Sequence, residues 1–354
     1  MWRTRGHPRA VEALQADLAA GNGPHAYLIT GPPRIGKSLL ARELAMAFNC
    51  TGWQGEAQTS LFGALQPFAA AGQPGPCYEC GSCIKALAGA HPDITVLDEW
   101  TAERSSIIDQ VRAVQYASNL LPYEGRWKVY ALLNADQLTL PAQNALLKTL
   151  EEPAASVRMI LTAPAALNLL PTVVSRCRPV PLRLVGRADI AAAIAAKAAL
   201  ESGQSEDLAG LAAGRIGWAL QAAGEPELLE IRRAALAHLV ELLGASTAAR
   251  FRAAEQLAAS AASNPSELAE VLALWLSWLR DLLLVAEGCP HLAVNGDHSA
   301  TLARAAAECP PAEVRRAVQA MQRTIGHVAG TTNTRLALEV LMLHLPALSP
   351  ATIG

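Results

Sequence analysis

Short apolar segments alternate with amphipathic ones in the first half of the chain. Apolar runs of strand length occupy residues 26–30, 94–97, 129–133 and 159–162. Each is too short for a helix and suits a strand buried on both faces of a parallel sheet. Residues 11–20, 38–48 and 139–150 instead place apolar side chains at helical spacing, and Thr139 and Pro153 give the last of them a start and a stop signal. Strands that alternate with helices predict an α/β layered domain.

The pattern changes near residue 184, after which no strand signal is present. Residues 188–221 predict a small helical unit. Longer helices are predicted near residues 225–243, 247–260, 265–287, 311–326 and 333–345. The chain therefore joins an α/β part to an all-helical remainder, and its 354 residues suit two or three domains.

The composition narrows the functional classes. The chain is 51% hydrophobic and 17% charged with a formal net charge of −2, which argues against a globally basic nucleic-acid binder. Its most apolar helix, near residues 268–286, contains Glu270, Arg280 and Asp281, and the longest uncharged run there is far shorter than the roughly 20 residues of a membrane span. The first residues show no signal-peptide pattern. We expect a cytoplasmic protein without membrane contact.

An eight-residue segment after the first apolar run fits the phosphate-loop pattern G-x-x-x-x-G-K-[ST]. Its residues are Gly31, Pro32, Pro33, Arg34, Ile35, Gly36, Lys37 and Ser38. Such a loop works because backbone N–H groups and a helix N-terminus converge on phosphate oxygens. Lys37 is expected to reach the β- and γ-phosphates of ATP or ADP, and Ser38 a Mg²⁺ ion. Arg34 departs from many such loops, which have glycine at this position.

The apolar run at residues 129–133 is the expected partner of this loop, but its end lacks the usual acids. An acid at the end of this strand would hold magnesium through water, and the next residue would orient the attacking water. Leu133 and Asn134 stand in those places, and Asp136 comes two residues later. Leucine cannot ligate a metal and asparagine is a poor base. The sequence therefore predicts that nucleotide is bound without being hydrolysed.

Four of the seven cysteines form a cluster made of Cys50, Cys77, Cys80 and Cys83. Tight C-x-x-C turns allow four thiolates to close a tetrahedral shell around one Zn²⁺, which leaves no position for water and indicates a structural role. An iron–sulfur cluster and unliganded thiols are the rival interpretations. Residues 51–76 between the first two cysteines are rich in Gly, Ala, Gln and Pro and predict a surface loop, whose function the sequence does not indicate.

Arg176 lies in the sequence Ser175-Arg176-Cys177, beyond the last predicted strand. An arginine at a domain edge can act as a finger that stabilises a transferring phosphate in a neighbouring subunit. It can also form a surface salt bridge, and the residues alone favour the salt bridge.

These features occur together with further motifs along almost the whole chain. They are Gly6-His7, His25-Ala26-Tyr27-Leu28, His91-Pro92-Asp93, Ile108-Asp109-Gln110-Val111-Arg112, Lys128-Val129-Tyr130, the segment 144–153 and the segment 333–339. In this combination the chain resembles the delta-prime subunits of the bacterial DNA polymerase III clamp loader, a family of the AAA+ class. Each motif alone is unspecific, whereas the combination is highly specific.

The resemblance implies three domains. They are an AAA+ phosphate-loop domain over residues 1–183 with a four-cysteine module inserted at 50–83, a small helical lid over 184–224, and a helical collar over 225–354. It also implies a place in a five-subunit ring with gamma/tau motor subunits and a delta subunit. There the chain would be a rigid stator during ATP-driven loading of the sliding clamp on primer-template DNA. In this family Arg176 would be a trans-acting finger, which reverses the preference for a salt bridge.

Two polar groups of the motor subunits are missing. The strand at residues 159–162 ends in Thr162 and Ala163 where a sensor-type polar residue is expected. Gly217 stands where the sensor arginine of the lid is expected, and Arg215 comes two residues early. Both losses agree with a subunit that does not hydrolyse ATP.

Two other functions compete with this interpretation. Intact Lys37 and Ser38 are compatible with a catalytically active motor subunit of the gamma/tau type. The cysteine cluster is compatible with a zinc-dependent module that binds DNA, although its vicinity contains only one basic residue, Lys85.

Overall fold

The computed structural model of the chain describes residues 1–21, 23–54, 72–98, 100, 107–198, 201–328 and 333–349. The chain divides into two compact units, Met1–Ala193 with Gly214–Trp218, and Ile194–Ala213 with Ala219–Gly354. The expected lid, residues 184–224, contributes to both units. The division into three domains stays a prediction.

Five parallel strands form the sheet of the first unit. They are β1 (Ala26–Thr30), β2 (Ile94–Leu97), β3 (Lys128–Leu132), β4 (Val157–Ala163) and β5 (Arg178–Pro181), in the order β2-β3-β4-β1-β5. Four of them lie where the apolar runs predict strands, with shifted ends for β3 and β4; the fifth was not predicted. Because the strands are parallel, their carboxyl ends meet at one edge of the sheet, where open α/β folds bind ligands.

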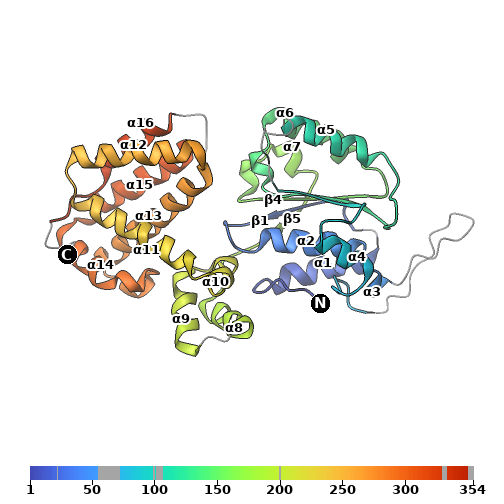
Figure 1. Ribbon diagram of the computed structural model, residues 1–354, viewed down its shortest axis with the longest axis horizontal. Helices are drawn as coiled ribbons and strands as arrows, with labels where there is room; N and C mark the ends of the chain where they lie inside the picture. Colours follow the sequence, from blue (N-terminus) through green and yellow to red (C-terminus); the bar gives the residue numbers. More distant parts are fainter. Residues whose placement is uncertain are drawn as a thin grey trace, which may run out of the picture. The chain divides into compact units, whose positions relative to one another are not determined.

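Helices cover both faces of this sheet (Figure 1). The first face carries α1 (Pro8–Ala20) and α2 (Lys37–Phe48), and the second carries α5 (Ile107–Ser118), α6 (Leu140–Glu151) and α7 (Pro171–Val174). Within β1, Tyr27 and Ile29 pack on the first face and Ala26 and Leu28 on the second, as alternation along a strand requires. The predicted α/β class is confirmed, although α5 was not among the predicted helices.

The connecting elements are short. After α2 come α3 (Thr51–Gln54) and α4 (Gly81–Leu87), and the 3-10 turns η1 (Ala135–Gln137) and η2 (Ala166–Asn168) follow β3 and β4. Within the loop predicted over residues 51–76, residues 55–71 lie outside the described residues. The helical segment predicted over residues 188–221 consists of α8 (Arg187–Lys197), α9 (Ser202–Leu211) and α10 (Ile216–Ala222).

The outer edge of β5 carries prolines where amides would point away from the sheet. Leu182 N donates to Thr30 O at 2.7 Å, so the amides two residues apart along this strand face β1. The positions between them are Pro179 and Pro181, which have no N–H. This free edge therefore lacks the N–H donors with which a further strand would pair.

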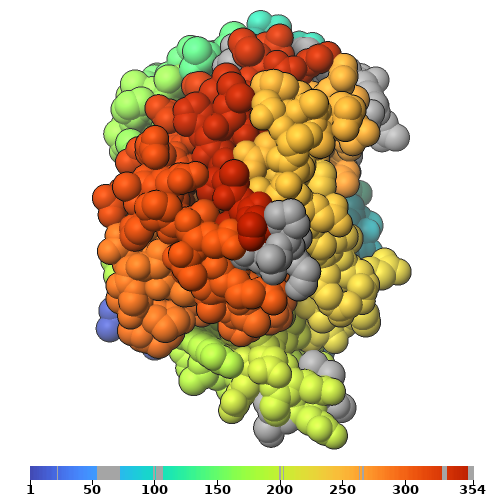
Figure 2. Space-filling model, turned by 90° about the vertical axis from the view of Figure 1, so that its left-hand side faces the viewer, coloured from blue at the N-terminus to red at the C-terminus, as the bar shows by residue number. Residues whose placement is uncertain are grey.

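Helices alone build the second unit from residue 219 onward in the part that the structure describes. They are α11 (Glu227–Gly244), α12 (Thr247–Ser263), α13 (Pro265–Ala286), α14 (Ser299–Glu308), α15 (Pro311–Val328) and α16 (Thr334–His344), with 3-10 turns η3 (Pro290–Leu292) and η4 (Gly296–His298). The hydrophobic pattern of the sequence does not predict α14. Trp275, Trp278 and Leu279 of α13 are completely buried, which places this helix at the centre. Figure 2 shows α16, in red, between α12 and the orange α15.

The apolar character of α13 serves this helical core. Its buried Asp281 accepts hydrogen bonds from Val294 N and Asn295 N at 2.8 and 2.7 Å, so the charge is fully partnered inside the unit. Among the residues that the structure describes, no helix combines the length and the apolarity needed to cross a membrane.

Candidate functional site

The phosphate loop joins β1 to α2 and contains three residues with positive φ. These angles are 152° at Gly31, 58° at Arg34 and 105° at Gly36. At Gly31 a Cβ would lie 2.7 Å from Leu182 O, so glycine is required. Arg34 adopts a left-handed conformation that costs a residue with a side chain about 1–2 kcal/mol. This cost is the physical reason why glycine suits that position better than arginine.

Lys37, the first residue of α2, folds back over the loop. Its Nζ donates to Gly31 O at 2.7 Å and to Pro32 O at 2.9 Å, and the side chain is buried. Burial lowers the pKa of Lys37, while the negative charge of Asp136 opposes that shift. The next residue, Ser38, is exposed. The loop thus presents an ammonium held among backbone groups and a hydroxyl open to solvent, as a site for phosphate and magnesium requires.

Two segments contact the loop from outside. His7 Nε2 lies 3.0 Å from Ile35 O, and since a carbonyl only accepts, Nε2 carries the donated proton. Burial lowers the pKa of His7, which keeps the ring neutral at pH 7. Trp218 N donates to Arg34 O at 3.0 Å, and a Cβ on the adjacent Gly217 would lie 2.5 Å from the same oxygen. There is no room for an arginine at position 217 in this arrangement.

The end of β3 is closed by apolar packing and backbone hydrogen bonds. Leu133 is 2% exposed and belongs to the core beneath α2, and its carbonyl accepts from Trp100 Nε1 at 2.6 Å. Asn134 has a φ of 53°, and its amide donates to Thr162 Oγ1 at 2.9 Å. The hydroxyl of Thr162 therefore holds the backbone at the end of β3.

Asp136 is closer to the phosphate loop than the sequence alone suggested. It lies in η1, directly after the end of β3, where its charge and that of Lys37 shift each other's pKa. Burial is the larger effect and raises the pKa of Asp136. One carboxylate oxygen, Oδ1, is buried and has no hydrogen-bond partner among the described residues. A carboxylate thus approaches the loop from the 3-10 turn rather than from the strand end.

The four predicted cysteines come together in the structure. All four sulfurs lie within 4.8 Å of one another, with Cys77 and Cys83 Sγ 3.9 Å apart and Cys50 and Cys80 Sγ 4.0 Å apart. Sulfurs bound at about 2.3 Å to one tetrahedral Zn²⁺ are about 3.8 Å from each other. These distances also exceed a disulfide bond by far. The residues present therefore fit one four-coordinate metal ion.

Backbone amides donate hydrogen bonds to sulfurs of this cluster. Cys77 Sγ accepts the amides of Glu79 at 3.4 Å and Cys80 at 3.2 Å. The hydrogen bond from Cys83 lowers the pKa of Cys50 and raises the pKa of Cys83, while burial raises the pKa of Cys77. Gly52 is required beside the cluster because a Cβ there would lie 2.8 Å from Cys77 Sγ. The chain is thus arranged around the sulfurs as around a bound ion.

Arg176 forms the ion pair that the residues alone had favoured. Its guanidinium lies 2.7 Å from Glu151 Oε1 at the end of α6, and it also donates to Thr172 O at 2.8 Å. About a third of the arginine side chain and half of the glutamate side chain are exposed. An exposed pair of this kind contributes at most about 1 kcal/mol, so the guanidinium can be redirected to a stronger anion.

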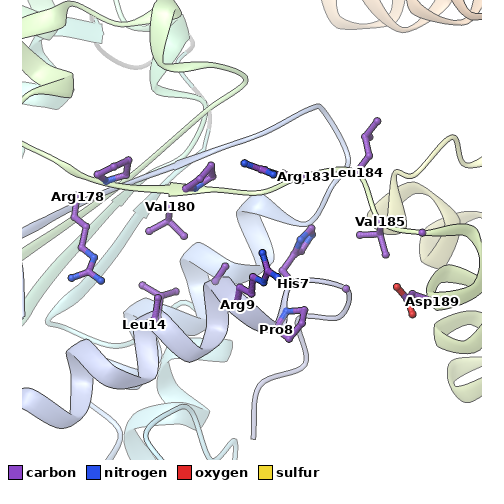
Figure 3. A pocket seen from close by; sticks show the side chains of 16 residues that line it. His7, Pro8, Arg9, Leu14, Arg178, Val180, Arg183, Leu184, Val185 and Asp189 are labelled. Carbon is purple, nitrogen blue, oxygen red and sulfur yellow. The ribbon is translucent and has the colours of Figure 1, made fainter.

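A cavity of about 520 Å³ lies between α1 and β5 (Figure 3). Apolar side chains of both elements line it together with Arg9, Arg178, Arg183 and Asp189, and His7 connects it to the phosphate loop. Its volume is within the range of small-molecule sites. The phosphate-loop residues 31–38 do not contribute to its lining.

The sequence reasoning missed Glu43 of α2, which is 1% exposed. It accepts hydrogen bonds from Arg3 N, from Thr4 N and its hydroxyl, and from the hydroxyl of Tyr78. The available signal was an acid within the apolar stripe of the helix, three residues after Leu40. An acid in such a stripe indicates a buried carboxylate with partners from elsewhere in the chain.

Comparison with known proteins places this geometry in a family. The family model described as DNA polymerase III, delta subunit matches residues 6–185, just over half of the 354 residues. The chain belongs to this family. It is thus a member of the DNA polymerase III clamp-loader subunits, and the order of its five parallel strands accords with their AAA+ type of fold.

Curated members of this family match parts of the chain. The delta' subunit of DNA polymerase III from Pseudomonas aeruginosa is 38% identical over 154 residues, which is 43% of this chain and 41% of that protein. The delta' subunit from Bacillus subtilis is 30% identical over 178 residues, 50% of this chain and 47% of that protein. The gamma/tau subunit from Mycobacterium tuberculosis is 27% identical and matches 98% of this chain but 61% of its own length. The matched parts therefore span less than two thirds of these relatives.

Solved structures show only a distant likeness. A DNA polymerase III gamma subunit-related protein from Thermotoga maritima has a TM-score of 0.44 at 17% identity and covers 95% of this chain and 98% of its own. The RuvB Holliday junction branch migration motor of Thermotoga maritima has a TM-score of 0.39 at 15% identity and covers 62% of this chain and 61% of its own. Neither likeness bears on function.

Proposed function

We propose that this chain is the non-hydrolysing delta-prime subunit of the DNA polymerase III clamp loader. It would be a stator in a five-subunit ring with gamma/tau motor subunits and a delta subunit, during loading of the sliding clamp on primer-template DNA. The observation that carries the proposal is the contrast within one nucleotide site. The phosphate loop has Lys37 and Ser38 in place, whereas Leu133 is packed into the core where a metal-binding acid would stand. ATP or ADP would be held here without turnover.

The chemistry that the chain contributes to the ring would reside on Arg176. Its pairing with Glu151 keeps the guanidinium extended at the carboxyl end of α6 and partly exposed. A guanidinium so placed can stabilise the charge on a phosphate that is being transferred in the neighbouring subunit.

The test uses the reconstituted loader with Arg176→Ala in this subunit. Loss of an arginine finger removes a factor of about 10³ or more from ATP hydrolysis in related systems, so DNA-stimulated turnover should fall strongly at the site completed by this subunit. Arg233→Ala, which removes an exposed ion pair with Glu230, is the matched control and should leave the rate unchanged. An unaltered rate in the Arg176→Ala loader would refute the finger.

One helix of the second unit supports a place in a ring. Leu336, Val340 and Leu343 of α16 are 56%, 46% and 61% exposed, and their spacing puts them on one stripe of the helix. Apolar stripes left exposed in this way mark protein–protein contacts. The collar function proposed for residues 225–354 would use this stripe.

The alternative is a catalytically active motor of the gamma/tau type. It is favoured by the intact Lys37 and Ser38 and by the match of 98% of this chain to a gamma/tau subunit. Robust ATP hydrolysis by the isolated chain, abolished by Lys37→Ala, would establish this alternative and refute a non-hydrolysing role.

A structural Zn²⁺ is proposed for Cys50, Cys77, Cys80 and Cys83. When bound, it would cross-link the turn at Cys77 to the end of α2 and supply folding energy rather than chemistry. Elemental analysis should find about one zinc per chain, and the absorption spectrum should lack iron–sulfur bands. A chain that is fully folded and carries no metal as purified would exclude the site.

A further inference from the structure

The loop that carries the cysteines also holds a distant part of the chain. Trp2 Nε1 donates to Pro74 O at 3.0 Å, and Gln15 Nε2 of α1 donates to the same oxygen at 3.2 Å. The indole lies directly over Gly75, where a Cβ would be 2.5 Å from Trp2 Nε1. The backbone leading into the cysteine turn is therefore shaped to receive residue 2.

Glu43 lies at the centre of this contact. It is on α2, the helix that begins with Lys37 of the phosphate loop. One oxygen accepts from Arg3 N and from the hydroxyl of Tyr78, and the other accepts from Thr4 N at 3.1 Å and from the Thr4 hydroxyl. A buried carboxylate needs such donors, because leaving it unpartnered costs several kcal/mol. The three segments are therefore held together by one charge.

Tyr78 connects Glu43 to the cysteines. It lies between Cys77 and Cys80 and has a φ of 66°, which is an outlier for an aromatic residue. The guanidinium of Arg3 lies 3.8 Å from the centre of its ring. Strain of this kind persists where the surroundings impose it and is often part of a function. Here the turn between two clustered cysteines imposes it and aims the phenol at α2.

The same segment then reaches the phosphate loop. Three residues after Thr4, His7 donates from Nε2 to Ile35 O at 3.0 Å. Between them Gly6 has a φ of 79°, and a Cβ there would lie 2.7 Å from a methyl group of Val185. Residues 2–7 thus form a continuous connection from the cysteine cluster to the backbone of the phosphate loop.

We propose that metal binding by the cysteine cluster positions the phosphate loop through Tyr78, Glu43 and residues 2–7. Glu43 and His7 are then positioning residues for nucleotide phosphates, acting through α2 and through Ile35 O. This inference rests on the proposed metal and nucleotide sites. The cysteine module would therefore do more than stabilise its own turn. Metal binding to its cysteines would set the rigidity of the phosphate loop, which none of these cysteines contacts.

Hydrogen exchange of the full-length chain tests the connection. Tyr78→Phe keeps all four cysteines, so it should keep about one zinc per chain while amides of residues 2–7 and 31–38 exchange at least tenfold faster. Removal of the metal by a chelator should produce the same pattern. His7→Phe should accelerate exchange in residues 31–38 and leave the Thr4 amide protected. Tyr116→Phe, at a tyrosine that is 75% exposed, is the matched control and should change neither segment.

A second readout separates this inference from the proposed function. Binding of a fluorescent ADP analogue should weaken about three- to tenfold in Tyr78→Phe and His7→Phe, and Glu43→Gln should be milder than Glu43→Ala because an amide oxygen still accepts hydrogen bonds. If the unmodified chain binds no nucleotide, that part of the proposed function fails, and exchange in residues 31–38 still decides the positioning. Unchanged exchange there in metal-depleted protein and in Tyr78→Phe would overturn the inference. A metal-free chain with protected residues 31–38 would overturn the part assigned to the metal.

Discussion

The carboxyl ends of β1 and β3 lie on the same edge of the sheet and differ in what their chemistry depends on. At the end of β1 the important groups are mostly backbone N–H and carbonyl groups, shaped by Gly31 and Gly36. At the end of β3 catalysis would depend on two particular side chains, and the chain has Leu133 and Asn134 there. Under the proposed function, two substitutions would suffice to remove hydrolysis from the second end, whereas the first end keeps its form as long as its glycines remain. Binding and turnover would then be separable within one site.

The largest effect is expected when acids are placed at the end of β3, which makes it more similar to the end of β3 expected in a hydrolysing subunit. Leu133→Asp combined with Asn134→Glu should lower the free energy of unfolding by about 3–5 kcal/mol, because residue 133 points into a closed apolar core. ATP turnover should stay absent. Denaturant unfolding and a phosphate-release assay measure the two effects. Asn134→Glu alone should lower the free energy of unfolding by no more than about 1 kcal/mol, because residue 134 has a left-handed conformation that asparagine tolerates better. A double variant as stable as the unmodified chain would contradict the closed packing at residue 133.

The second prediction concerns the phosphate loop at the end of β1, where the ammonium group of Lys37 can be removed. Lys37→Ala removes charge-assisted hydrogen bonds to phosphate, each of which contributes about 1.5–3 kcal/mol. Affinity for ADP should fall about 10- to 100-fold in a titration followed by calorimetry. Lys197→Ala, at an exposed hydrogen bond to Leu220 O, is the control. Equal affinities of the Lys37→Ala and unmodified chains would show that nucleotide does not use this loop.

The third prediction concerns Gly217, which lies close to the backbone of the phosphate loop at Arg34. Gly217→Ala places a Cβ 2.5 Å from Arg34 O and should destabilise the first unit by about 1–2 kcal/mol, despite the better helix propensity of alanine. Gly203→Ala in α9 brings its new Cβ within 4 Å of no described residue beyond its own helix and chain neighbours, and should be neutral or slightly stabilising. Thermal unfolding compares the two variants. Equal midpoints would mean that the contact at Gly217 is loose.

The smallest effect is expected from the charge beside Lys37. Burial raises the pKa of Asp136 above 3.8, so the folded state binds more protons than the unfolded state between the two pKa values. The unmodified chain therefore loses this contribution to stability as the pH rises through the raised pKa. Asp136→Asn should be slightly more stable at pH 7, by no more than about 1 kcal/mol, and equal at pH 3. If the stability difference between Asp136→Asn and the unmodified chain grew toward low pH, the pKa of Asp136 would be lowered by folding and not raised.

The parts of the fold that follow local patterns could be predicted from the sequence. Apolar runs gave four of the five strands, and Thr139 caps α6 by accepting from Ala142 N at 3.4 Å. The missed helix α14 is only 10 residues long, and Leu302 is the one large apolar side chain that it buries, beside the small Ala305. The fifth strand, β5, has alternating prolines that argue against a strand in any local pattern.

The parts of the site whose residues are close together in the sequence could be predicted. The phosphate loop and the four cysteines could be found because their residues are close in sequence. Glu43, Trp218 and His7 could not be assigned, since their partners lie between 28 and 184 residues away and depend on the tertiary fold. For Arg176 the pairing with Glu151 agrees with the salt bridge favoured by the residues alone, while the finger remains a proposal.

Pro179 and Pro181 at the outer edge of β5 have a consequence for the unassembled chain. Under the proposed function, a newly made subunit would expose this edge, which begins two residues after Arg176, before it meets its neighbours. Strand edges with free amides can recruit other chains into extended sheets, and prolines suppress that reaction. The same edge can still meet a partner through side chains. The two prolines would thus limit strand-to-strand association of a free subunit while leaving its side chains available for the proposed assembly.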